Sequence, residues 1–275
     1  MKIMRHIVVL GIAAFFAVMW GALLRERLPE LFIRRVPPSY DRLLEGEQDE
    51  REVVMGFYRG DSRVGEVRSR ISRREGYVEI ENNTQISFGG LLKYFAPDVD
   101  SLEARFVAEV SEGSGLQSFS LRSKQLDLMV QGTVRGEELQ LTGAMGGQKI
   151  DEHLPYDREV FVGDMLSPTT GIADLEQVSP GETWTIRFVN PIAGGVQPVE
   201  VQLVASERFE VGEQQMDVYH LAFRAGTGNW SAFVTGGGEV LVQGTPFGLI
   251  LRREDLSPAM EPVVEELSTL VSTGE

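Results

Sequence analysis

The side chains that most often carry catalysis or bind metals are scarce in this sequence. The chain contains three histidines and no cysteine. His6 lies in the N-terminal tip, while His153 and His220 stand alone, without the paired spacing of a zinc motif. The absence of cysteine removes disulfides, thiolate metal sites and thiol nucleophiles. We therefore expect neither a metal nor a cofactor, and we interpret His220 as a core or face residue of a strand.

Three other motifs lack residues that their chemistry requires. The chain has no Gly-x-Ser-x-Gly motif, which would mark a serine nucleophile. Asp98, Asp100 and Glu109 have the spacing of a calcium loop, but the glycine that such a loop needs at its sixth position is absent. The glycine-rich segment 143–149 lacks the Gly-Lys-Ser/Thr ending of a phosphate loop. We predict no catalytic residue, and hence a protein that is not an enzyme.

One dense group of basic residues stands out in an otherwise acidic region. It contains six arginines: Arg59, Arg63, Arg68, Arg70, Arg73 and Arg74. This basic cluster has two interpretations. It is a docking surface for anionic lipid headgroups or an acidic partner, or it is a solvated face that neighbouring glutamates neutralise, with each exposed pair contributing about 0–1 kcal/mol. The many nearby glutamates favour the second interpretation.

A short apolar segment between Gly89 and Pro97 supplies the candidate ligand contacts. It could be a loop that caps one end of a sheet, or a lip that exposes its large side chains to a ligand or a bilayer. A second apolar candidate, in a later strand, would lie near the same opening. These candidates are Leu91, Leu92, Tyr94, Phe95 and Trp230.

The elements that must position these residues are strands. Apolar and polar residues alternate with a period of two, and Gly- and Pro-rich turns separate the runs. No crossover helix of a parallel fold is visible. The predicted strands are 53–58, 64–72, 77–88, 103–110, 116–122, 126–134, 139–142, 150–154, 183–188, 199–209, 216–224, 230–235, 239–243 and 249–253.

The second and third of these strands should form a charged hairpin. If its turn centres on Arg74–Glu75, Arg70 lies opposite Glu79 and Arg68 lies opposite Glu81. Opposite charges that face each other across an antiparallel pair stabilise it modestly. The expected hairpin therefore carries an exposed ladder of ion pairs.

The fold class that follows is mainly β, with an antiparallel curved sheet that forms a barrel, half-barrel or sandwich after one N-terminal transmembrane helix. The β-rich domain should span 51–256, with two halves that could meet near 161–178. Residues 257–275 are expected to form a tail or a short helix.

The N-terminal region carries a long apolar stretch. After a tip of residues 1–6, the segment from Ile7 to Leu24 contains no charged or amide side chain. Its length meets the lower limit for a membrane-spanning helix. A cleaved signal and a buried core helix are the alternatives. Because bulky residues occupy the places where an Ala-x-Ala cleavage site needs small ones, we favour an uncleaved signal anchor. Residues 25–50 then form a stalk, either an amphipathic turn along the headgroups or an unstructured linker.

Charge is distributed unequally along the chain. Residues 1–40 hold six Lys/Arg against two Asp/Glu, whereas residues 41–275 hold 20 against 39. Such an acidic domain should be repelled by phosphate backbones, so we expect no nucleic-acid partner. The basic tip favours a cytoplasmic N-terminus, and we predict a single-pass protein of the bacterial inner membrane with its C-terminal domain on the periplasmic side.

Two short sequence motifs resemble those of a known family. The first is the hairpin Gly56–Gly65, and the second is Pro180–Trp184 with Asn190–Pro191 and the later Trp230. Together they resemble exported bacterial β-domains of uncharacterised function, including DUF3108-like periplasmic proteins and the β-domains that precede transglutaminase-like modules. The resemblance implies an extracytoplasmic accessory or binding domain, and it implies no catalytic residue.

Two functional hypotheses follow. The chain is a membrane-tethered, non-enzymatic accessory or interaction module of the cell envelope, with an envelope protein or a lipid as its possible partner. Alternatively, it carries or senses an apolar ligand such as a lipid inside its curved sheet.

Overall fold

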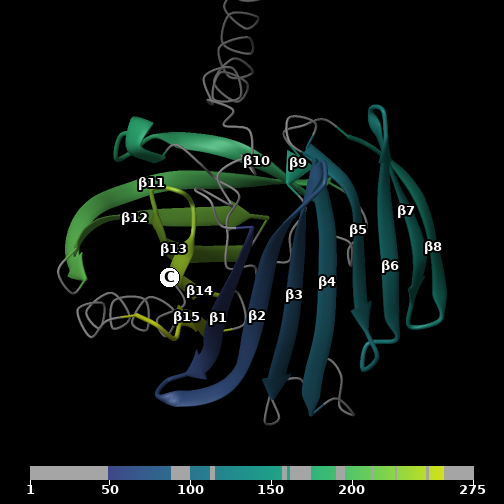
Figure 1. Cartoon of the computed structure of the whole chain (residues 1–275), viewed down its shortest axis with the longest axis horizontal. Coiled ribbons are helices and arrows are strands. Elements are labelled where there is room, and N and C mark those ends of the chain that lie inside the picture. Colours follow the sequence, from purple (N-terminus) through teal and green to yellow (C-terminus); the bar gives the residue numbers. More distant parts are fainter. Residues whose placement is uncertain are drawn as a thin grey trace, which may run out of the picture. The chain divides into compact units, whose positions relative to one another are not determined.

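The computed structural model divides the chain into two compact units, Met1–Arg35 and Val36–Glu275. All residues that the structure describes belong to the second unit (Figure 1). They are residues 49–87, 100–111, 115–156, 160–161, 175–189, 196–211, 214–226, 228–245 and 248–256.

The first half of the described chain is a run of antiparallel strands in sequence order, each bonded to the next (Figure 1). The strands are β1 (Glu50–Arg59), β2 (Ser62–Arg74), β3 (Tyr77–Ser87), β4 (Ser101–Ser111), β5 (Gly115–Ser123), β6 (Leu128–Arg135), β7 (Glu138–Met145) and β8 (Gln148–Pro155).

The second half forms a similar run. It contains β9 (Val160–Phe161), the short 3-10 helix η2 (Leu175–Gln177), β10 (Thr183–Val189), β11 (Val196–Val211), β12 (Gln214–Ala225), β13 (Gly228–Thr235), β14 (Val240–Gly244) and β15 (Ile250–Arg253). Strand β9 is parallel to β10, and the other pairs are antiparallel.

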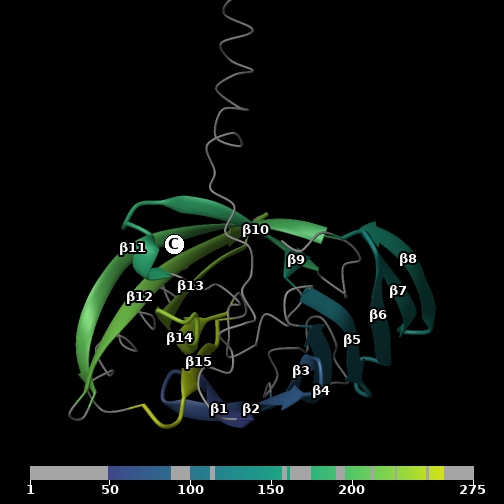
Figure 2. The same ribbon diagram turned by 45° about the horizontal axis from the view of Figure 1, so that its top comes forward.

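The first and last strands join the two runs. Because β1 pairs with β15, all strands of the described ranges belong to one 15-stranded sheet, whose edges are β8 and β9 (Figure 2). The prediction of a mainly β, antiparallel fold is confirmed, and the sheet is open. The two predicted halves therefore share one sheet.

Several predictions concern residues outside the described part of the chain. The anchor 7–24, nearly all of the stalk 25–50, the tail 257–275 and the apolar segment 89–97 lie there. Within the described ranges, no helix has the length and apolar character needed to cross a bilayer.

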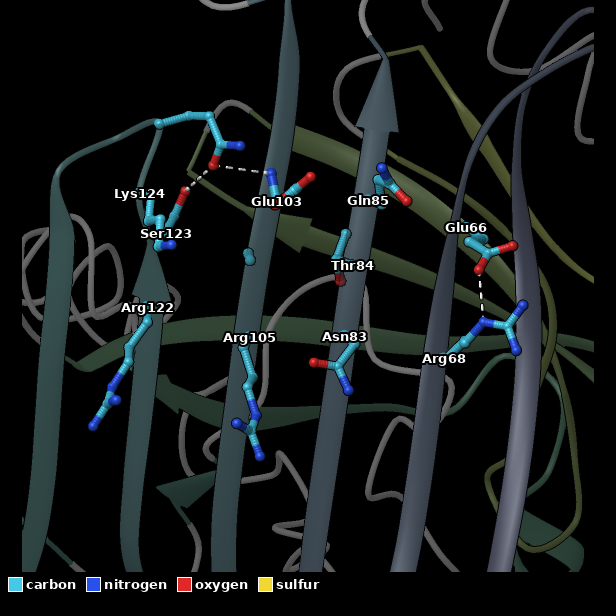
Figure 3. Close-up of a pocket in the computed structure, with 12 residues that line it drawn as sticks. Glu66, Arg68, Asn83, Thr84, Gln85, Glu103, Arg105, Arg122, Ser123 and Lys124 are labelled. Atoms are coloured by element: carbon cyan, nitrogen blue, oxygen red, sulfur yellow. Dashed lines mark hydrogen bonds and ion pairs between the residues drawn. The ribbon is translucent and has the colours of Figure 1, made fainter.

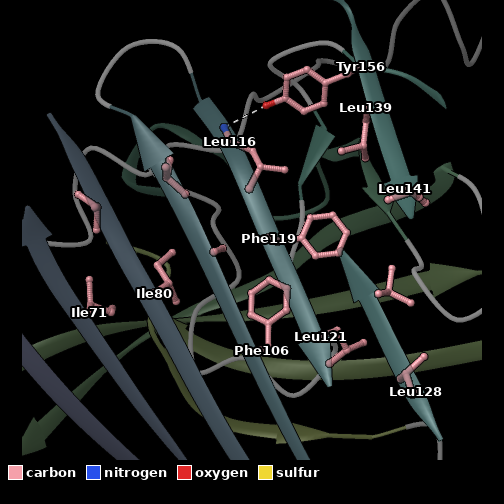
Figure 4. Packing of buried hydrophobic residues seen from close by; sticks show 14 residues of the cluster. Ile71, Ile80, Phe106, Leu116, Phe119, Leu121, Leu128, Leu139, Leu141 and Tyr156 are labelled. Atoms are coloured by element: carbon pink, nitrogen blue, oxygen red, sulfur yellow. Dashed lines mark hydrogen bonds between the residues drawn. The ribbon is translucent and has the colours of Figure 1, made fainter. Parts of the chain in front are cut away.

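Alternation of side chains explains the large core on the inner face of the first run. In β3, every second residue from Val78 to Ile86 is buried, and the residues between them are polar. The first core cluster combines such residues from β2 to β7 with Tyr156, whose hydroxyl accepts a hydrogen bond from the Leu116 amide at 3.0 Å (Figure 4). Phe188 of β10 also packs against this cluster, so the sheet curves enough to bring β10 to the inner face of the first run.

Side chains also join the two runs where β1 meets β15. Tyr58 of β1 packs against a second core cluster of β12 to β15. Elsewhere on β1, Nη2 of Arg51 donates to Oε2 of Glu239 at 2.7 Å, and Nη1 of Arg253 lies 3.3 Å from the same oxygen. The carboxylate of Glu239, the residue that precedes β14, therefore connects β1 with β15.

The hairpin between β2 and β3 corrects the predicted register. Arg74 pairs with Tyr77, so the loop consists of Glu75 and Gly76 rather than being centred on Arg74 and Glu75. Gly76 adopts φ +87°, which glycine tolerates and which a two-residue hairpin loop needs. This loop shifts every pair by two residues: Arg70 lies opposite Glu81, and Arg68 lies opposite Asn83 instead of Glu81.

Candidate functional site

A row of polar side chains crosses the outer face of four adjacent strands. Arg68 of β2 lies opposite Asn83 of β3, Asn83 opposite Arg105 of β4, and Arg105 opposite Arg122 of β5. All four residues are exposed, because each alternates with buried neighbours in its own strand. The antiparallel ladder thus brings together residues that are distant in sequence.

This row crosses a groove of about 440 Å³ (Figure 3). Both its walls and the adjoining β5–β6 turn are polar. The groove is lined by Glu66, Arg68, Asn83, Thr84, Gln85, Glu103, Ala104, Arg105, Arg122, Ser123, Lys124 and Gln125. Its position on strands fixes the side-chain origins more rigidly than a mobile loop would.

At the β2 edge of the groove, the cations are already paired with a carboxylate. Nε of Arg68 donates to Glu66 at 2.6 Å, and Nη2 of Arg63 donates to the other Glu66 oxygen at 2.8 Å. The hydrogen bond from Arg68, followed by that from Arg63, holds the pKa of Glu66 below its ordinary value. Both positive charges are therefore already engaged by carboxylates.

The β4–β5 part of the groove differs. Nε of Arg105 lies 3.0 Å from a Glu81 oxygen, to which the Asn83 amide also donates at 2.8 Å. The Asn83 bond, followed by that from Arg105, lowers the pKa of Glu81. In contrast, no carboxylate of the described residues pairs with Arg122 or Lys124. Two cations on this side retain their full capacity to bind an anion.

Gln125 adds a neutral donor at the end of the groove. Its Oε1 accepts hydrogen bonds from the Glu103 backbone amide at 3.3 Å and from the Ser123 hydroxyl at 3.5 Å. These bonds fix the orientation of the side-chain amide and leave its nitrogen without a partner among the described residues. The amide nitrogen is consequently available to a bound acceptor.

The structure divides the predicted basic cluster. Arg63, Arg68, Arg70 and Arg74 form ion pairs with nearby glutamates, while Arg59 and Arg73 lie near the ends of β1 and β2. Of the six arginines, only Arg68 lines the groove. This arrangement agrees with a solvated face.

The groove residues of β4 and β5 were missed from the sequence. Arg105 and Arg122 could each have been assigned to an exposed strand face by alternation. Their juxtaposition required the register across the β4–β5 hairpin, which contains a bulge between Glu109 and Val110. The sequence carries no local signal for this pairing.

Trp230, another predicted ligand contact, does not line the groove. Trp230 is partly buried and stacks on Phe223, with 5.3 Å between ring centroids and 3° between ring planes. Leu91, Leu92, Tyr94 and Phe95 lie outside the described residues. The predicted mouth of a lipid cavity therefore stays a prediction.

The two histidines within the described sheet make contacts typical of structural residues. The ring of His220 stacks on Phe233 with 4.4 Å between centroids, and Nδ1 of His153 lies 2.8 Å from Glu138. Within the described ranges, no three His, Asp or Glu side chains gather where they could hold a metal ion.

Comparison with known proteins adds no relative: no family model, curated protein or solved structure matches the chain. The groove must therefore be interpreted from its own chemistry. Guanidinium and ammonium groups stay charged at neutral pH and donate hydrogen bonds without accepting any. The arrangement is suited to holding an oxyanion.

Proposed function

We propose that this chain is a membrane-tethered, non-enzymatic interaction module of the bacterial cell envelope, and that it contacts its partner through the groove on β2 to β5. One observation carries the proposal: Arg122 and Lys124 have no carboxylate partner among the described residues, and they lie beside a groove of about 440 Å³. The volume of the groove lies within the range of about 300–1,000 Å³ that is typical of ligand sites.

The sequence supports the location. The apolar stretch 7–24 has the length of a membrane anchor and follows a basic tip. A tether would hold the domain near envelope components and so raise their effective concentration at the groove. A modest intrinsic affinity would then suffice for binding.

The proposal is tested by photo-crosslinking in cells that express the full chain. A benzophenone amino acid replaces Gln85, which lines the groove, or Gln202, an exposed glutamine of β11 that serves as the matched control. We expect the position in the groove, and not the control, to crosslink a discrete envelope component. Equal labelling from both positions, or none from Gln85, would contradict the proposed contact surface.

A separate experiment tests whether residues 7–24 anchor the chain in the membrane. Membranes washed with alkaline carbonate should retain the full chain, and the mass of the retained protein should include residues 7–24. A mature protein that begins near residue 23 would remove the tether from the proposal and leave the interaction surface in place.

A further inference from the structure

The ligand class of the groove follows from its donors. We infer that Arg105, Arg122 and Lys124 form a binding site for a phosphate group carried by a larger ligand (Figure 3). This inference rests on the proposed function, because it names what the same surface recognises.

The β4–β5 register provides the first argument. Arg105 and Arg122 are direct cross-strand partners on the exposed face. Directly opposed side chains have Cβ atoms about 4.5–5.5 Å apart, and like charges in such pairs are destabilising. An anion bound between the two guanidinium groups would convert this repulsion into two attractive contacts. Glu81 already offsets part of this repulsion through its ion pair with Arg105, and a bound anion would offset the charge that Arg122 retains.

The local charge balance provides the second argument. The groove contains four cationic and two anionic side chains, in a region of the chain where acidic residues outnumber basic ones. Glu66 is engaged by Arg63 and Arg68, so Glu103 is the remaining carboxylate in the lining. Arg105 is paired with Glu81, so Arg122 and Lys124 are the two cations of the lining without a carboxylate partner among the described residues, and they outnumber Glu103. Their excess positive charge favours an anionic ligand.

Donor geometry favours phosphate over a single carboxylate. The side chains of Arg105 and Arg122 extend in the same direction from neighbouring strands, and Lys124 follows at the end of β5 (Figure 3). Guanidinium groups bind oxyanions through two parallel hydrogen bonds. Two neighbouring guanidinium groups offer more donors than a single carboxylate can accept, and they suit the several oxygens of a tetrahedral phosphate.

The size of the groove indicates that the phosphate belongs to a larger molecule. Ligand sites typically have volumes of about 300–1,000 Å³, a range that includes this groove. The walls next to the cations carry Asn83 and Gln85, which can bond to hydroxyl groups. A phosphate ester with a polar organic group fits this lining. Its source is either a lipid headgroup or a free metabolite.

The test uses the full chain in a nonionic detergent and calorimetric titration with two probes. Glycerol 3-phosphate represents a free ester, and dihexanoyl phosphatidic acid represents a lipid headgroup; dihexanoyl phosphatidylcholine is the zwitterionic control. We expect saturable binding of at least one phosphate monoester and weaker binding at high salt. If both probes bind, a free phosphate ester is sufficient for recognition. If phosphatidic acid alone binds, the ligand is a lipid headgroup.

Two substitutions with the same charge change locate the site. Arg122→Gln should weaken binding about tenfold or more, because charge-assisted hydrogen bonds are lost. Arg135→Gln, on the same face of β6 but outside the groove, should change the affinity less than about twofold. Thermal unfolding provides the structural control: Arg122→Gln should melt no lower than the wild type, because it removes the opposed arginine pair.

Two results would overturn the phosphate assignment: no saturable binding by the wild type, or equal weakening by both substitutions. The crosslinking experiment separates this failure from that of the proposed function. If Gln85 crosslinks a partner but no phosphate ester binds, the proposed interaction module stands and phosphate is excluded as its ligand. The absence of both results excludes both proposals.

Discussion

At the scale of single residues, one glycine shows how an aromatic ring fixes the core of the first run. Gly132 of β6 lies directly opposite Phe119 of β5. A Cβ atom on Gly132 would lie 2.1 Å from the Cε1 atom of the Phe119 ring. Glycine normally weakens a strand interior, but here the buried ring covers it and packs beside Phe106. The glycine is required because the ring occupies the space of its missing side chain.

We therefore predict that Gly132→Ala destabilises the fold by about 1–3 kcal/mol, the usual cost of forcing extra atoms into a packed core. Urea unfolding measures the change. Gly228→Ala is the control, because its Cβ would lie at an ordinary 3.5 Å from the nearest atom. Adding Phe119→Leu to Gly132→Ala should recover part of the lost stability. An unchanged midpoint for Gly132→Ala would show that the ring moves aside without cost.

At the scale of elements, the contact between β1 and β15 depends on a shared carboxylate. Glu239 binds Arg51 of β1 and Arg253 of β15. Burial lowers the pKa of Arg51, but a guanidinium stays charged at neutral pH. Removing the negative charge would leave Arg51 without a carboxylate partner among the described residues and close to Arg253, which keeps its ion pair with Asp255. The junction therefore needs Glu239 in its ionised form.

The expected effect of Glu239→Gln is a loss of about 1–3 kcal/mol, as for hydrogen bonds to charged groups. The matched control is Glu200→Gln on β11, which bonds the more exposed Arg224 and should cost about 0–1 kcal/mol. Side-chain exposure separates the two cases: Arg253 is 16% exposed, and Arg224 is 67% exposed. Equal losses in urea unfolding would argue against a special role for the junction.

The strands themselves were largely predictable from the sequence. Alternation located β3 and β11 because each buries one face, and Gly-rich turns marked their ends. The register of the β2–β3 hairpin was wrong by two residues, because the loop is set by the positive φ of Gly76. A shift of two keeps every side chain on its face, so the predicted exposure of Arg68 and Arg70 was still correct.

The candidate site was much less predictable. Its cations come from three strands, and local sequence patterns do not specify which residues lie opposite each other. The closure of β1 on β15 was equally invisible, because it pairs residues at opposite ends of the described chain. All five residues of β14 are buried, so this strand shows no alternation that would orient its faces.

At the scale of the whole molecule, charge pairs make the stability depend on pH. Arg70 lowers the pKa of Glu50, Arg68 lowers that of Glu66, and Lys149 lowers that of Asp151. A carboxyl whose folded pKa lies below its unfolded value contributes stability above the unfolded value. This contribution is lost as the pH falls through the folded value.

We predict that the urea midpoint is nearly constant from about pH 7 to about pH 5 and falls between about pH 4.5 and pH 3. Glu66→Gln should reduce the size of this fall, because it removes one of the carboxylates that must be protonated. Added salt at about 0.5 M should also reduce it by screening exposed pairs. A midpoint that rises on acidification would show that relief of the overall negative charge outweighs these pairs.

The pairing of β1 with β15 also determines the order in which the sheet can be completed. Met55 and Arg253 are neighbours although about 200 residues separate them, so the pairing carries a large loop-closure entropy. Adjacent strands of the first run can pair as soon as they are made, whereas the free edge of β1 must wait for the last strand. Until β15 is in place, that edge is an open template for pairing with other chains. A chaperone that shields this edge would raise the yield of folded protein more than one that shields any later hairpin.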